Sequence, residues 1–244
     1  MHLFNYILGN LIIMRYMFNI SYNITDHIIQ KYQLNPLKFD RFFECIYSSF
    51  HAGISTMLCS ISIKRPLFAI NEIWDYGSSI NVYDNQLQYF ISSFSFSYFL
   101  IDLLYCLYRK KYVFVLHHVA ALNLLLITFM NFYNHANKGV YTVYYLFLLE
   151  SNTILLNIGY LLKELQLHYS ITCTSWIIHL LLFSLFRLIM IPRLTLIYYM
   201  NEGFNGASIF EIPNLILIMS GSTYWAYRQT KGIHKLLKEN NIIN

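Results

Sequence analysis

The sequence predicts an all-α fold, a multi-pass transmembrane bundle of six or seven helices. Hydrophobic residues make up 57% of the 244-residue chain and charged residues only 12%, whereas charged residues are about 25% of an ordinary soluble domain. The mean hydropathy is +0.43. Apolar runs close to the roughly 20 residues that a helix needs to cross a bilayer recur along the chain.

The first of these runs, Leu3–Ile20, is the optional seventh span. It contains Asn10 and Arg15, has no basic segment before it and offers no small-residue cleavage site. We therefore expect a span or an interfacial helix rather than a cleaved signal peptide. The other runs follow in order at Phe42–Ile63, Gln88–Tyr108, Tyr112–Tyr133, Val140–Leu162, Ile171–Met200 and Ser208–Tyr227.

Short connections between the runs favour one helical bundle. We divide the chain into an N-terminal segment (residues 1–41), the bundle (42–230) and a basic tail (231–244). The longest connection, Lys64–Leu87, mixes aromatic and polar residues, as in an amphipathic segment at the membrane interface. Pro192 and Pro213 are expected to kink or shorten the last two spans.

Positive charge predicts the orientation of the bundle. One cluster is the loop Arg109–Lys111, and basic residues also crowd the tail. Because short cytoplasmic loops are rich in Lys and Arg, we expect both clusters, and the C-terminus, in the cytosol. Alternating the spans places Lys31–Arg41 and Lys163 on the same side. Topology and anionic headgroups explain these clusters, so no nucleic-acid role is predicted.

Motifs for several kinds of chemistry are missing. The four cysteines fall inside apolar runs without CxxC spacing, which argues against a disulfide framework and against a thiolate metal site. There is no HExxH or ExxH pattern, so we predict no metal and no resident cofactor. There is also no GxSxG serine and no phosphate-cradling glycine loop, which excludes hydrolase and ATP-driven readings of the sequence.

Ionisable residues inside the apolar runs mark the candidate site. A charge at membrane depth costs roughly 2.5–3.5 kcal/mol on insertion scales, so Asp102 and Glu150 should face a bundle interior or a wet cavity. On a helix the neighbours His117 and His118 point about 100° apart. One of them could contact substrate or a metal, while the other pairs with a neighbouring helix, for example through Asp102. The predicted catalytic set is His117, His118 and Asp102.

Helical spacing adds a predicted substrate-binding set. Residues at i, i+3 and i+7 lie on one face of a helix, so Asn157 shares a face with Glu150. Buried donors near the carboxylates would balance their charge. The predicted substrate-binding residues are His51, Glu150, Asn157 and Arg187. The alternative is that these residues have only a structural role, because polar residues also stabilise contacts between membrane helices by about 0.6–2 kcal/mol each.

Six motifs, taken in order, resemble the TLC-domain family, which includes TRAM proteins and ceramide synthases. The resemblance covers about Phe42–Lys238 and implies a multi-pass protein of the endoplasmic reticulum or another endomembrane. Its relatives synthesise, sense or move lipids. The motifs are SSFHAGIS, SYFLIDLLY, VFVLHHVAAL, LLESNTILLNI, FSLFRLIMIP and YWAYRQTKGIHK.

One segment separates this chain from ceramide synthases. Those enzymes share the histidine pair but carry a second His-Asp with a further Asp later in the chain, where this sequence reads LFLLESNTI with Glu150 as its acid. The segment is closer to TLCD-type members, which keep a Glu-Ser followed by an Asn. N-acylation of a sphingoid base is therefore not the leading expectation.

Three functions follow from these patterns. The first is a lipid-handling protein that holds an acyl chain among its helices and a polar head near His117, His118, Asp102 and Glu150. The second is a lipid acyltransferase with acyl-CoA as co-substrate, in which His117 or His118 is the general base and Asp102 orients it. The third is a cargo receptor or structural membrane protein that depends on its basic tail. Membrane lipids are the expected partners, and a homo-oligomer is compatible with the sequence.

Overall fold

The protein is all-α over the part of the chain that the computed structural model describes, residues 2–63, 82–131, 136–165, 169–202 and 208–239. This confirms the predicted fold class. Most of the predicted interfacial segment Lys64–Leu87 lies outside the described residues. The helices are α1 (His2–Lys31), the short η1 (Pro36–Lys38), α2 (Phe39–Ser62), α4 (Val82–Tyr108), α5 (Tyr112–Asn131), α6 (Ala136–Glu150), α7 (Thr153–Glu164), α8 (Tyr169–Phe183), η3 (Ser184–Met190), α9 (Ile191–Glu202) and α10 (Ser208–Glu239).

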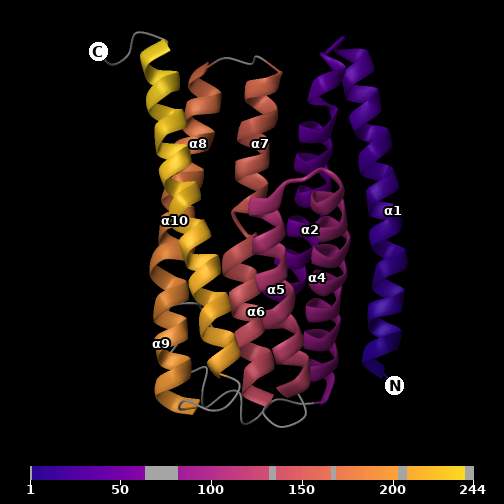
Figure 1. Ribbon diagram of the computed structural model, residues 1–244, viewed down its shortest axis with the longest axis vertical. Coiled ribbons are helices and arrows are strands. Elements are labelled where there is room, and N and C mark those ends of the chain that lie inside the picture. The colour runs from indigo at the N-terminus through magenta and orange to yellow at the C-terminus, as the bar shows by residue number, and fades with distance from the viewer. Residues whose placement is uncertain (1, 64–81, 132–135, 166–168, 203–207, 240–244) are drawn as a thin grey trace.

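The helices run along the long axis of the molecule, and the two chain termini lie at opposite ends (Figure 1). Helix α1 packs against α2 and α4, and α2 also packs against α6 and α7. On the other side, α10 packs against α5 and α8. Helices α6 and α7 follow one another along the axis, as do α8, η3 and α9, so each group forms one long crossing with an interruption (Figure 1).

Four helical stretches among the described residues are long and apolar enough to cross a membrane. They are Gln86–Tyr108, Tyr112–Phe129, Tyr141–Glu164 and Tyr169–Met200, and each coincides with a predicted span. Helices α1, α2 and α10 have 30, 24 and 32 residues, which is long enough to span, but they are more polar. The count of six or seven spans therefore stays a prediction.

The span Tyr141–Glu164 is interrupted near its middle, where the sequence predicted one continuous run. Helix α6 ends at Glu150 and α7 begins at Thr153. The carbonyl of Leu149 accepts a hydrogen bond from the guanidinium of Arg187 and one of 3.4 Å from the hydroxyl of Thr153. Backbone groups within a bilayer need such partners, because no water is available there. The interruption is thus stabilised by a side chain from another span.

The next span changes its helical pitch before Pro192, a position where the sequence predicted a kink or a shortening. The turn η3 is π-helical, and the N–H of Ile191 donates to the carbonyl of Phe186, five residues back. Proline has no N–H for the usual bond and its ring clashes with the preceding turn; widening the turn accommodates both. Pro213 lies inside α10, which continues past it to Glu239.

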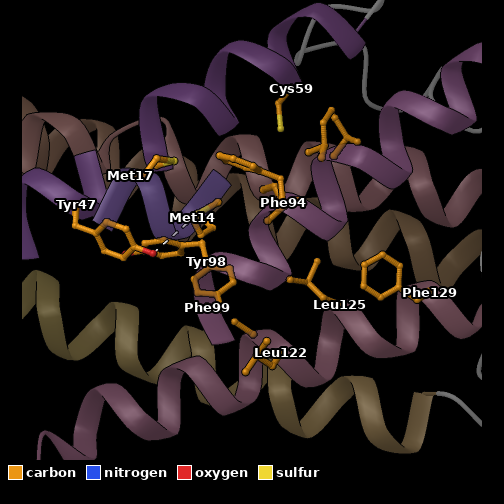
Figure 2. Packing of buried hydrophobic residues seen from close by; sticks show 14 of the residues in the cluster. Met14, Met17, Tyr47, Cys59, Phe94, Tyr98, Phe99, Leu122, Leu125 and Phe129 are labelled. Atoms are coloured by element: carbon orange, nitrogen blue, oxygen red, sulfur yellow. Dashed lines mark hydrogen bonds between the residues drawn. The ribbon is translucent and has the colours of Figure 1, made fainter. Parts of the chain in front are cut away.

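A hydrophobic cluster joins α1 to the remainder of the bundle. Met14 and Met17 of α1 pack among aromatic side chains of α2 and α4, and the hydroxyl of Tyr47 donates to the sulfur of Met14 at 3.9 Å (Figure 2). The buried amide of Asn10 donates to Ser93 Oγ at 2.8 Å. Helix α1 is therefore packed into the fold by apolar and polar contacts.

Ion pairs tie the loops at one end of the bundle. Lys38 Nζ lies 2.9 Å from Glu164 Oε2, and Arg109 and Lys111 pair with acidic residues in the first turns of α2. The α1–α2 connection, the end of α7 and the end of α10 share this end of the molecule (Figure 1). The segments Lys31–Arg41 and Arg109–Lys111 are thus brought together, as alternation of the spans requires.

Candidate functional site

A cavity of about 470 Å³ lies among α2, α4, α5, the end of α6, α7, α8, η3 and α10. Most of the residues that line it have polar or charged side chains, and Arg41, Lys111 and Arg228 contribute to it from the basic end of the bundle. We call this space the polar chamber. It is lined by all but one of the predicted site residues, namely Asp102, His117, His118, Glu150, Asn157 and Arg187.

A second, apolar chamber of about 100 Å³ adjoins it. Its walls include Leu124, Leu125 and Ile191, together with four tyrosines. The two chambers have lining residues in common, so they meet. These shared residues are Phe99, His117, Glu150 and Arg187. Charged and titratable groups thus stand at the junction between a polar space and an apolar one.

The two adjacent histidines of α5 face different neighbours. His118 Nε2 lies 3.0 Å from Asp102 Oδ2 of α4, and the hydroxyl of Tyr98 donates to the same oxygen at 3.2 Å. His117 meets the ring of Trp225 on α10 edge-on, with 5.0 Å between the ring centroids. This is the arrangement in which one histidine pairs with a neighbouring helix while the other stands at the chamber junction.

His51 lies behind the wall of the polar chamber, not among its lining residues as the sequence analysis expected. It is 0% exposed, and its Nδ1 lies 3.6 Å from Glu150 Oε2. Its Nε2 lies 3.0 Å from Ser55 Oγ, and its ring stacks on Tyr98 with centroids 3.8 Å apart. His51 is therefore placed to position Glu150. A predicted contact with substrate would need a displacement of this packed ring.

Arg187 is the buried cation of the site. It lies in the π-helical turn η3 and is 7% exposed. Its guanidinium donates to the carbonyl of Leu149, lies 5.0 Å above the centre of the Phe183 ring and attracts the carboxylate of Glu150. π-Helical turns are frequent at functional sites. Here the turn holds a positive charge at the chamber junction.

Asn157 connects two helices of the wall. Its amide nitrogen donates to Ser48 Oγ at 2.6 Å and to Ser49 Oγ at 3.0 Å, which joins α7 to α2. Both amide hydrogens are used in this way, so its oxygen is the group left for a ligand. Asn157 thus contacts α2 as well as the chamber.

The structure adds lining residues that the sequence analysis did not select. Asn152 stands at the interruption between α6 and α7, and it is buried. His179 Nδ1 lies 2.7 Å from Gln229 Oε1 of α10. Cys106 lies one helical turn after Asp102. This spacing of four residues is the feature of the sequence that could have identified Cys106 as a lining residue. Trp225 belongs to the closing motif, but its contact with His117 depends on how α10 packs.

Comparison with known families gives one match. The family described as TLC domain matches residues 41–230, which is most of the chain and includes all the predicted site residues. No curated protein and no solved structure matches the chain.

Proposed function

We propose that this chain, which belongs to the TLC-domain family, binds a membrane lipid inside its helical bundle and thereby influences membrane lipid composition. The observation that carries the proposal is the junction of the two chambers at His117, Glu150 and Arg187. A lipid has a polar head and an apolar chain, and the bundle offers one space for each. We also propose that the chain is more similar to TLCD-type members than to ceramide synthases. Its proposed location is the endoplasmic reticulum or another endomembrane.

The chemistry of the walls supports this placement. The head would lie in the polar chamber near His117, His118, Asp102 and Glu150, whereas part of an acyl chain would enter between Leu124, Leu125 and Ile191. The polar chamber of about 470 Å³ is within the range of small-molecule sites, roughly 300–1,000 Å³. Charged groups at membrane depth are expensive and usually serve a ligand or an ion. A bound lipid head would explain why the bundle contains charged groups at this depth despite their cost in free energy.

A chamber-filling substitution tests lipid binding. Leu124→Trp places a large ring in the apolar chamber, whereas Leu126→Trp makes the same change on the exposed face of the same helix. We expect lipid mass spectrometry of the purified protein to show several-fold less bound lipid for Leu124→Trp and an unchanged amount for Leu126→Trp. Size-exclusion profiles and thermal unfolding verify that both variants fold. Equal lipid in the two folded variants would overturn the proposal.

Acyl transfer is a second candidate, favoured by the 3.0 Å pair of His118 and Asp102 on the chamber wall. A histidine oriented by a carboxylate can remove the proton from a lipid hydroxyl or amine, which then attacks the thioester carbonyl of acyl-CoA and releases coenzyme A as its thiol. General-base help typically contributes 10²–10⁴-fold. We expect His118→Ala to lose that factor with labelled acyl-CoA, while His234→Ala, an exposed change in α10, retains full transfer. Undiminished transfer by His118→Ala would exclude this mechanism.

The proposal includes an orientation with the basic end and the C-terminus in the cytosol. All four native cysteines are buried, so a maleimide that cannot cross membranes should label them slowly. Leu37→Cys, at a position 89% exposed in the α1–α2 connection, and Lys238→Cys near the end of α10 report on this end. We expect both to be labelled from the cytosolic side of sealed vesicles. Labelling of the two from opposite sides would contradict the arrangement of the crossings.

A further inference from the structure

We propose that Asp102, Cys106 and His118 form a binding site for a divalent transition metal, Zn²⁺ in the first instance, on the wall of the polar chamber. One ligand atom from each residue, a carboxylate oxygen, a thiol sulfur and an imidazole nitrogen, lies within 4.8 Å of the others. Asp102 and Cys106 are four residues apart on α4, so they share a face of that helix. His118 completes the group from α5, and all three residues line the polar chamber.

The donor set selects the class of metal. Thiolate, imidazole and carboxylate together are ligands of Zn²⁺ and similar borderline ions, whereas Mg²⁺ and Ca²⁺ prefer oxygen ligands alone. Ligands of one tetrahedral zinc ion are about 3.3–3.8 Å apart, as bond lengths of about 2.0–2.3 Å require. His118 Nε2 and Asp102 Oδ2 are already 3.0 Å apart. A slight opening of that pair and a small movement of the cysteine side chain would bring all three into range.

Charge and burial favour occupation. Cys106 is 4% exposed and His118 is 5% exposed, so both lie where an isolated charge is costly. A thiolate and a carboxylate carry two negative charges, which a divalent cation neutralises, and the coordinated group has no net charge. The hydroxyl of Tyr98 donates to Asp102 Oδ2 at 3.2 Å. Metal-ligating carboxylates need such an outer hydrogen bond to fix their orientation.

Three protein ligands leave one coordination position of a tetrahedral ion unfilled. Structural zinc sites are closed by four protein ligands, whereas sites with three keep the fourth position for water or a substrate atom. Because the group lines the polar chamber, that position would face the space proposed for the lipid head. An oxygen of a head group is the chemical class that it would take. The metal site itself does not depend on lipid being bound.

The test uses the full chain purified in detergent. We expect about one zinc per chain by elemental mass spectrometry after equilibration with ZnCl₂ and removal of free metal. With Co²⁺, a thiolate ligand should give a near-ultraviolet charge-transfer band. Cys106→Ser should abolish this band and weaken metal binding at least 10-fold, and Asp102→Asn should weaken binding similarly while keeping some band. Cys45→Ser is the matched control, because Cys45 is buried and lines the same chamber but is not in the group.

Several results would overturn the site. They are the absence of bound zinc in wild type, binding by Cys106→Ser equal to wild type, and a cobalt band that survives Cys106→Ser. Bound lipid is measured on the same samples, so the two proposals can fail separately. Zinc without lipid would support the metal site and count against lipid binding, and lipid without zinc would do the reverse.

Discussion

Replacing Arg187 with leucine is expected to lower the free energy of unfolding by about 1.5–3 kcal/mol, the usual worth of a hydrogen bond made by a charged group. Arg187 is buried and attracts Glu150, and its guanidinium donates to the carbonyl of Leu149 at the interruption of the neighbouring span. In the leucine variant, the carboxylate of Glu150 lacks this nearby positive charge and the carbonyl of Leu149 lacks this hydrogen-bond donor. Unfolding of the purified protein in mixed micelles with increasing denaturing detergent measures the change.

Two further variants separate charge pairing from loss of packing. Arg193→Leu removes an exposed arginine six residues away, and we expect its stability within about 0.5 kcal/mol of wild type. The double variant Arg187→Leu/Glu150→Leu replaces both charges by apolar groups, which is often neutral for stability. It should recover much of the loss seen for Arg187→Leu. If the double variant is less stable than Arg187→Leu, the interaction with Glu150 is not the source of the effect.

Gly159→Ala is expected to lower the free energy of unfolding by about 1–3 kcal/mol, as overpacking a dense interior does. An added Cβ at Gly159 would lie 2.3 Å from Cδ1 of Trp176. The indole cannot move away freely, because on its other side a Cβ built at Gly232 would lie 3.1 Å from the same ring system. The tryptophan of α8 is thus held between a glycine of α7 and a glycine of α10. Thermal unfolding in detergent measures the loss.

Gly9→Ala provides the matched control for this substitution. Gly9 is also helical, but a Cβ built there meets nothing within 4 Å. Alanine is a better helix former than glycine by about 0.8–1.0 kcal/mol, so this variant should be as stable as wild type or slightly more so. Similar destabilisation of both variants would show that close packing of Trp176 does not explain the effect at Gly159.

Much of the helical framework could be predicted from apolar length alone. The predicted run Gln88–Tyr108 corresponds to the apolar helix Gln86–Tyr108, because hydropathy reports directly on which segments avoid water. The interruption at Ser151 and Asn152 could not be predicted. Neither residue forbids a helix, and the partner that stabilises the break, Arg187, comes from a span that follows later in the chain.

The helix face on which each site residue lies could be predicted, but which neighbouring helix covers that face could not. Helical geometry indicated that His117 and His118 face different neighbours, and the structure gives those neighbours as Trp225 and Asp102. The same geometry gives the face on which His51 lies but not that α4 covers it, so its place behind Glu150 was missed. Cys106 was not selected because the four cysteines show no CxxC spacing.

The bond between Arg187 and the Leu149 carbonyl also bears on the order of assembly during synthesis. The ribosome produces the span Tyr141–Glu164 before Tyr169–Met200, so the acceptor carbonyl and Glu150 precede the arginine into the bilayer. An arginine at the centre of a newly inserted helix costs roughly 2.5–3.5 kcal/mol. Here it arrives beside partners that are already in place. We therefore expect these two consecutive spans to integrate as a unit, with the earlier span acting as the template for the later one.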